Sequence, residues 1–165
     1  MLRIRDVRPS ELDTTAEVMV AAYREYVPPD APPMLQGYVD EIRDVRSRLA
    51  DSTLILAEDD GQILGAVTYY GDATREPHAP WPAGWANFRL LAVAPSARGK
   101  GIGRALTEEC LTRARAAGRT GVGLHTTQMM QVARAMYERM GFVRVPEFDF
   151  SPVPGFLVMA YRLSL

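Results

Sequence analysis

The chain has 165 residues, 19 basic and 20 acidic side chains, a net charge of −1 and 47% apolar residues. That length suits one domain, 1–165, which would bury roughly two thirds of its unfolded surface. No apolar run reaches membrane-spanning length, which excludes a membrane span. Cys110 is the one cysteine, so an intrachain disulfide is excluded. No basic run is interleaved with aromatic residues, which disfavours nucleic-acid binding. Because the first residues lack the apolar core of a signal peptide, we expect a cytoplasmic protein.

The charges are distributed unevenly along the chain. Residues 1–76 contain 15 acidic and 8 basic side chains, whereas residues 77–165 contain 5 acidic and 11 basic ones. A basic half favours a phosphorylated ligand and an acidic half favours a cationic amine acceptor, while solvated surface charge without a partner explains the acidic half equally well.

The first half of the chain predicts a strand, two helices and a hairpin. Residues 2–7 alternate apolar and polar, as a strand does. Apolar residues then recur at helical spacing after Ser10, a candidate N-cap, and again over 34–50, on either side of a proline-rich break. Residues 53–58 and 62–70 flank Asp59-Asp60-Gly61, which predicts a β-hairpin.

The second half predicts alternating strands and helices. The long loop 71–85 carries Pro77, Pro80, Pro82 and two tryptophans, and it suits a flap, a subunit contact or a loop packed on itself. We expect strands over 86–94 and 121–126, helices over 102–117 and 129–140, and a final strand pair over 142–150 and 155–163. Cys110 falls on the apolar face of the first of these helices, where burial is expected.

Leu90 to Ala117 reads as a strand, a glycine loop and the start of a basic helix. Gly99, Gly101 and Gly103 alternate in the loop, so the backbone can turn tightly and leave room for an approaching group. The first N–H groups of a helix lack partners within it, and the helix dipole makes that end positive. With the nearby Arg98, Lys100 and Arg104, this stretch predicts a site for a phosphorylated ligand.

Two common phosphate-binding motifs fail on required residues. A P-loop needs Ser or Thr directly after Gly-Lys, but Gly101 follows Lys100. A dinucleotide fingerprint needs a third glycine where Leu106 stands, and an acid at the end of the next strand, which reads Leu124-His125-Thr126.

The remaining pattern resembles a known family. Arg98-Gly99-Lys100-Gly101-Ile102-Gly103, following Leu91-Ala92-Val93-Ala94-Pro95, is similar to the acetyl-CoA loop of the GCN5-related N-acetyltransferase (GNAT) superfamily, and 133–142 is similar to its second signature. The resemblance implies an α/β (α+β) fold: a mixed, twisted sheet of about seven strands with helices on both faces, in the order βααβββαβαββ. It also implies that the first two helices line the acceptor site.

The resemblance implies an acyltransferase that binds acetyl-CoA and transfers the acetyl group directly, within a ternary complex, to a primary amine of a small molecule or peptide. Tyr137 would be the general acid that protonates the departing thiolate. Backbone groups of the central strand would hold the pantetheine arm, and the loop would hold the diphosphate. The implied cofactor-binding residues are Leu91, Ala92, Val93, Arg98, Gly99, Lys100, Gly101, Ile102, Gly103, Arg104 and Ala133, with no metal.

The general base is the open question of the sequence. Many relatives carry a glutamate near positions 87–89, but this chain reads Asn87-Phe88-Arg89. His125 and Glu147 are the candidate bases, and a chain of ordered water is a further possibility. The missing carboxylate keeps an alternative function open, a non-catalytic sensor or scaffold that holds acyl-CoA. A homodimer is compatible with the resemblance.

Overall fold

The computed structural model describes residues 1–165 as two compact units, each made of two stretches of the chain. Unit 1 comprises Met1–Tyr69 and Leu90–Glu109, and unit 2 comprises Tyr70–Arg89 and Cys110–Leu165. Strand β4 (Trp85–Val93) and helix α4 (Ile102–Ala116) each begin in one unit and end in the other. The mixed α/β class is confirmed, with eight strands where about seven were expected, and no helix is both long and apolar enough to span a membrane.

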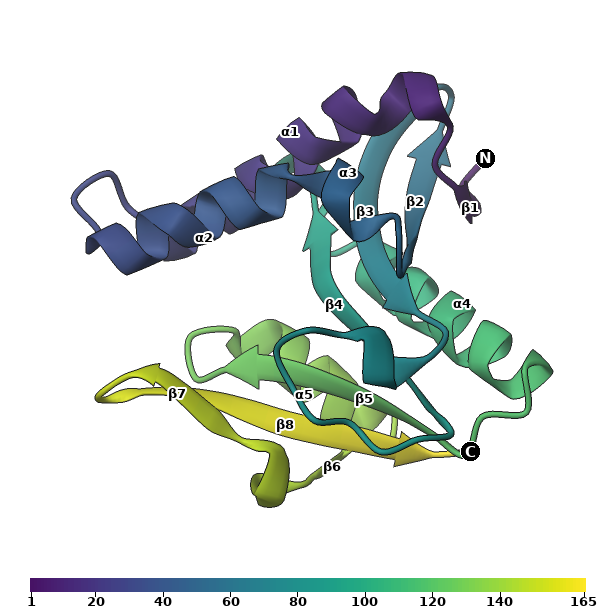
Figure 1. Cartoon of the computed structure of the whole chain (residues 1–165). Coiled ribbons are helices and arrows are strands. Elements are labelled where there is room, and N and C mark those ends of the chain that lie inside the picture. The colour runs from purple at the N-terminus through teal and green to yellow at the C-terminus, as the bar shows by residue number, and fades with distance from the viewer. The chain divides into compact units, whose positions relative to one another are not determined.

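Unit 1 contains an antiparallel three-strand arrangement and two long helices. Strand β1 pairs with β2, and β2 pairs with β3. Helices α1 and α2 lie side by side (Figure 1). The bounds are β1 Arg3–Asp6, β2 Thr53–Asp59, β3 Gln62–Tyr70, α1 Leu12–Tyr23, α2 Pro33–Arg43 and α3 Val45–Arg48, with 3-10 turns η1 Pro9–Glu11, η2 Arg24–Tyr26 and η4 Pro95–Ala97.

The β2–β3 hairpin forms where the sequence predicts it. Its two turn residues, Asp60 and Gly61, have φ values of 46° and 80°. A two-residue type I′ turn requires positive φ at both positions, and Asp and Gly are among the residues that tolerate it best. The register pairs Asp59 with Gln62, shifts by one residue between Glu58 and Ala57, and then runs to Thr53 with Tyr69.

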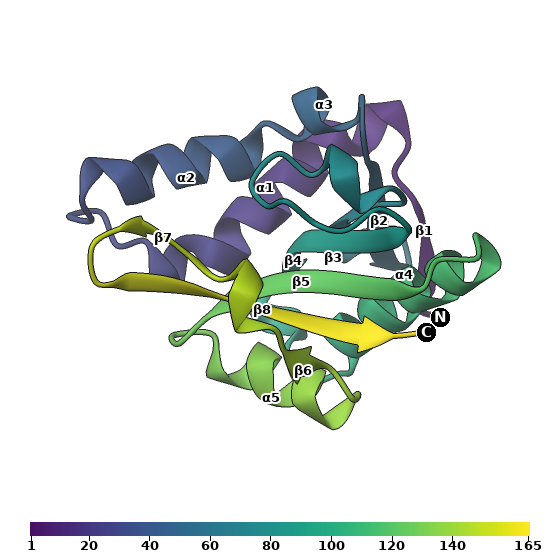
Figure 2. The ribbon, with the colours of Figure 1, turned by 60° about the horizontal axis from the view of Figure 1, so that its bottom comes forward.

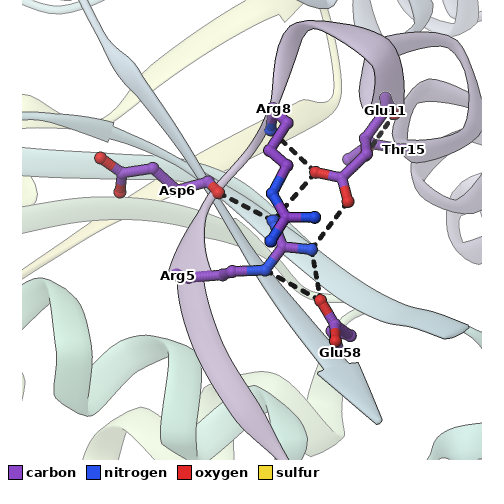
Figure 3. Close-up of polar contacts among 6 residues, drawn as sticks. All are labelled: Arg5, Asp6, Arg8, Glu11, Thr15 and Glu58. Carbon is purple, nitrogen blue, oxygen red and sulfur yellow. Dashed lines mark hydrogen bonds and ion pairs between the residues drawn. The ribbon is translucent and has the colours of Figure 1, made fainter. Parts of the chain in front are cut away.

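The start of α1 differs from the expectation, because Ser10 does not cap it. A 3-10 turn precedes the helix, and the Glu11 side chain accepts a hydrogen bond from the Arg8 N–H at 2.8 Å. Glu11 also binds Arg5 of β1 through two hydrogen bonds, of 2.7 and 2.9 Å, and Arg5 binds Glu58 of β2 (Figure 3). The Arg5 guanidinium lowers the pKa of Glu11 to about 2. One half-buried cation thus joins β1, η1 and β2.

The expected helix over 34–50 is interrupted. Asp44, with φ −78° and ψ 66°, ends α2, and its side chain accepts the Ser47 N–H at the start of the four-residue α3. Asp competes with the helix backbone for hydrogen bonds, which favours a break at this residue.

Unit 2 contains the first part of β4, strands β5 to β8 and helix α5. Strand β4 is parallel to β5, while β8 lies antiparallel between β5 and β6 and also pairs with β7. Figure 2 shows α5 on one side of β5 and β8, and the loop that precedes β4 on the other. The bounds are β5 Gly121–Thr127, α5 Gln131–Arg139, β6 Val143–Arg144, β7 Phe150–Val153 and β8 Phe156–Ser164, with 3-10 turns η3 Ala73–Arg75 and η5 Pro146–Phe148.

The expected strand over 142–150 is wrong in its middle. It divides into β6, the turn η5 and the start of β7. Pro146 has no N–H to donate to a strand ladder, and Arg144 closes the turn with two 2.7 Å hydrogen bonds to Asp149. A strand over 142–150 would have put Glu147 and Asp149 on one face, but Glu147 lies in η5 and Asp149 directly after it.

Strand β4 carries a backbone irregularity at Leu90. This residue has a φ of 55°, a left-handed conformation that a leucine rarely adopts, while its side chain is only 4% exposed. Within unit 2, β4 pairs with β5 over three residues, Trp85–Asn87 with Gly121–Gly123, whereas β5 continues along β8 to Thr127.

Candidate functional site

The glycine loop in unit 1 has the conformation that the sequence predicts. Gly99 and Gly101 have φ values of 75° and 77°, and no atom lies within 4 Å of where a Cβ would stand at either position. A group that approaches this backbone would therefore meet no side chain from the two glycines.

Helix α4 begins directly after the loop. Its first backbone hydrogen bond runs from the Ala105 N–H to the Gly101 carbonyl at 3.0 Å. The N–H groups of Ile102, Gly103 and Arg104 therefore precede any bond within the helix, and the dipole of this 15-residue helix adds positive potential there. Three donors of this kind, beside a glycine loop, suit a diphosphate.

The basic side chains of the loop have different surroundings. Arg98 holds the loop to the end of α1, because its guanidinium donates to the Ala22 carbonyl at 2.9 Å and pairs with Glu25 at 2.6 Å. Arg104 pairs with Glu108 at 2.7 Å on the exposed side of the helix, and Lys100 is exposed. Arg98 therefore holds the loop to the end of α1, while Lys100 and Arg104 lie at the surface.

The strand segment before the loop, 91–93, packs closely within unit 1. The Tyr23 hydroxyl donates to the Leu91 carbonyl at 3.1 Å. The Ala92 carbonyl oxygen would lie 2.6 Å from a Cβ at Gly65 of β3, so only glycine fits at that position. Tyr23 and Gly65 thereby fix the backbone that the sequence predicts as the pantetheine contact.

Tyr137 of α5 is buried in unit 2, with 5% of its surface exposed. Its ring lies 5.9 Å from that of Phe88 and 5.7 Å from that of Phe142. Burial raises the pKa of the hydroxyl well above its ordinary value of 10, and no hydrogen bond to the chain contributes to the shift. The phenol is therefore protonated at neutral pH and is a proton donor without a competing partner. Ala133, one turn earlier in α5, is half-buried.

His125 and Glu147, the two candidate bases, lie in different surroundings. The His125 ring contacts Trp81 at 4.8 Å and Phe150 at 5.0 Å between centroids, and its Nε2 lies 2.9 Å from the Phe148 carbonyl oxygen. A carbonyl only accepts, so Nε2 carries the proton and Nδ1 is the acceptor of the neutral ring. Burial lowers the pKa of His125. Glu147 is exposed in η5.

Glu76 is a buried acid that sequence reasoning missed. It follows η3 in the loop before β4 and is 4% exposed. Its carboxylate lies 3.9 Å from the Arg89 guanidinium of β4. The loop carried no local pattern that marks a glutamate as buried, so only the folded chain shows it.

A pocket of about 770 Å³ lies in unit 1 beside α2. Its wall is largely apolar, with polar groups from Arg24, Gln36 and Asp40. Its other lining residues come from α2 and from the proline-rich segment before it: Val27, Pro29, Ala31, Pro33, Gly37 and Val39.

The loop and helix geometry agrees with a family comparison. The family model for the acetyltransferase (GNAT) domain matches residues 50–144, more than half of the chain. The chain belongs to the GNAT acetyltransferase family. The family that the sequence resembles is thereby confirmed.

Curated GNAT relatives are similar over about two thirds of this chain. The mycothiol acetyltransferase of Cellulomonas flavigena is 35% identical over 119 residues, which cover 68% of this chain and 34% of that protein. The N-acetyltransferase 8B of Mus musculus is 30% identical over 116 residues, which cover 69% of this chain and 47% of that protein. The chain thus spans less than half the length of these relatives.

Solved GNAT structures share the fold over nearly the whole chain. The PaiA N-acetyltransferase of Thermoplasma acidophilum, solved with coenzyme A, has a TM-score of 0.74 at 18% identity and covers 99% of both chains. A GNAT acetyltransferase of Brucella melitensis, solved with acetyl-CoA, has a TM-score of 0.64 at 24% identity, over 100% of this chain and 91% of that one.

Proposed function

We propose that the chain is an acetyl-CoA-dependent N-acetyltransferase that transfers the acetyl group directly to a primary amine of a small molecule or peptide. The loop at Gly99–Gly101 carries this proposal. Two left-handed glycines with open surroundings lead into three helix N–H groups, and this arrangement suits the diphosphate of coenzyme A. Acetyltransferases of the same fold were solved with coenzyme A or acetyl-CoA, which supports the choice of ligand.

In this proposal the strand segment 91–93 contacts the pantetheine arm and Tyr137 is the general acid. Transfer needs a proton for the departing thiolate, and the Tyr137 phenol, whose pKa is raised by burial, is protonated at neutral pH and so has a proton to donate. The buried Cys110 is not placed to form a covalent acyl-enzyme, because it is fully enclosed in α4. The base among the sequence candidates, His125 or Glu147, stays a prediction.

The loop is tested by titration calorimetry with acetyl-CoA. We expect Gly101→Val to abolish binding, because valine strains the left-handed backbone and places a branched side chain where the diphosphate would lie. The matched control is Gly155→Val: Gly155 also has a positive φ, of 83°, and nothing within 4 Å of its Cβ position, but it lies in the β7–β8 turn. Equal affinity in wild type and Gly101→Val would contradict the placement of the ligand.

The reaction is tested by acetyl-CoA-dependent thiol release with a panel of amines that includes polyamines, amino acids, amino sugars and peptide N-termini. We expect release that depends on one class of acceptor. If the protein binds acetyl-CoA tightly but releases no thiol in response to any acceptor, the proposed enzyme is refuted and the non-catalytic acyl-CoA sensor or scaffold is favoured.

A further inference from the structure

The Glu76 carboxylate in unit 2 is buried, but only one of its two oxygens has a hydrogen-bond partner in the chain. Its side chain is 2% exposed. One oxygen, Oε1, accepts the His78 backbone N–H at 2.9 Å, while Oε2 is buried and has no hydrogen-bond partner in the chain. Glutamate is almost never fully buried unless it is paired, since removing a charge from water is costly. An acid kept in this state is a candidate for a functional role.

Two cationic or protonatable groups face this carboxylate. The Arg89 guanidinium lies 3.9 Å from Oε1, which is too long for a hydrogen bond but close enough for strong attraction. Burial lowers the pKa of His125 of β5, while the charges of Glu76 and Asp149 act to raise it and that of Arg89 acts to lower it. Asp149 itself is already bound by Arg144 at 2.7 Å.

Glu76 therefore lies beside the part of β4 where the sequence lacks an acid. Asn87 and Arg89 are two residues apart in the strand, so their side chains leave the same face. The Asn87 Nδ2 donates to the Gly123 carbonyl at 3.0 Å, whereas its Oδ1 is buried without a partner. Glu76 and Asn87 thus each offer an unused acceptor, which is the chemistry that an ammonium group or a bridging water requires.

Trp81 covers the neighbouring part of β5. Three of its ring atoms lie 2.7 to 2.9 Å from where a Cβ would stand at Gly123, and its ring packs against His125 and Phe148. Its own Nε1 is buried and has no partner in the chain. The loop that carries Glu76 is therefore held against the strands by an indole, and the acid lies in a setting of low dielectric.

We propose that Glu76 is the general base of the reaction and removes the proton from the acceptor ammonium, directly or through one water. The proton moves from nitrogen to the carboxylate, and the nitrogen lone pair forms the C–N bond as the C–S bond of the thioester breaks. The thiolate takes a proton from Tyr137, and the second proton lost by the nitrogen as the amide forms returns through solvent to the Tyr137 phenolate. Glu76 then releases its own proton to solvent, so one proton is released per turnover. This assignment rests on the proposed function. It places the base in the loop before β4 rather than at positions 87–89.

The test compares Glu76→Gln with wild type on the best amine of the panel. The glutamine keeps the shape of the side chain and its acceptor for the His78 N–H, so the fold should persist. We expect kcat/KM at pH 7 to fall by about 10²-fold, the scale of general-base catalysis, while acetyl-CoA affinity stays within about twofold. Activity of the variant should keep rising up to the acceptor's own pKa, because the amine must then lose its proton without help. Asp60→Asn, on the exposed β2–β3 turn, is the charge-matched control.

The alternatives give different results. A merely structural Glu76 would lower the melting temperature and leave the pH profile unchanged, which would overturn the proposal. Wild-type kcat/KM in Glu76→Gln would also overturn it and leave the proposed function intact. If wild type itself releases no thiol with any amine, the proposed function fails and the base assignment falls with it. If Glu76→Gln does not fold, Glu76→Asp is the second variant, because it retains the carboxylate. We expect it to have a reduced kcat and the wild-type pH profile. Activity of Glu76→Asp that keeps rising up to the acceptor's own pKa would refute the assignment.

Discussion

Gly65 offers a sharp test of the strand that the proposed coenzyme site depends on. A Cβ at this position would lie 2.6 Å from the Ala92 carbonyl oxygen, and 3.3 and 3.4 Å from side-chain atoms of Ile102 and Leu106. The carbonyl belongs to the backbone and cannot rotate away, so Gly65→Ala must displace β3 or the segment 91–93. Overpacking of this kind costs about 1–3 kcal/mol, and the reduced freedom of the unfolded chain returns about 0.4–1 kcal/mol.

The net loss should be up to about 2.6 kcal/mol, which lowers the melting temperature of a chain of this size by up to about 10 °C. Gly37→Ala is the control, since Gly37 lies inside α2 with nothing within 4 Å of its Cβ position. Alanine in a helix interior should raise stability there by about 0.5–1 kcal/mol. Thermal unfolding and acetyl-CoA calorimetry on both variants check the pair. A Gly65→Ala protein as stable as Gly37→Ala, with unchanged affinity, would refute the packing described for 91–93.

Three further outcomes are expected. Tyr137→Phe should lower kcat by about 10²-fold in the thiol-release assay with unchanged acetyl-CoA affinity and melting temperature, and equal loss of kcat and affinity would remove Tyr137 from the acid role. The pKa of Glu11 is lowered in the fold, so its pairing with Arg5 stabilises the protein above about pH 4.5, and this contribution is lost as the pH falls toward 2. Arg5→Met should therefore lower the free energy of unfolding in urea by about 1–3 kcal/mol at pH 7 and by almost nothing at pH 2. A loss that is independent of pH would contradict this. Gly123→Ala should displace Trp81 and change tryptophan fluorescence more than Gly121→Ala does, because a Cβ would lie 2.7 Å from Trp81 at Gly123 but 3.2 Å from Trp85 at Gly121. Equal spectra would count against the packing of Trp81.

Features set by local chemistry were predictable from the sequence. The Asp60-Gly61 turn, the glycine loop and the burial of Cys110 each follow from a residue's own conformational or apolar preference, and the structure confirms them. The end of α4 is another such case, because Gly118 adopts a φ of 68° two residues after the helix.

Features set by contacts between distant segments were not predictable. Glu76 is buried because its loop folds onto β4 and β5. Arg98 binds the carbonyl of Ala22 near the end of α1, a residue 76 positions earlier in the chain. Periodicity says nothing about either partner. The division of 142–150 lies between these cases: Pro146 was a readable signal against a strand, but the Arg144–Asp149 pair that closes the turn was visible only in the fold.

Leu90 limits how this chain can evolve. Its left-handed backbone costs about 1–2 kcal/mol, which glycine would recover, but loss of its buried side chain would cost about 1.5–3 kcal/mol. β-Branched residues would keep apolar surface and worsen the strain. Exchange of Leu90 for glycine or for a β-branched residue is thus unfavourable, so laboratory selection for new acceptors should keep an apolar side chain that is not β-branched at position 90 while varying the residues around it.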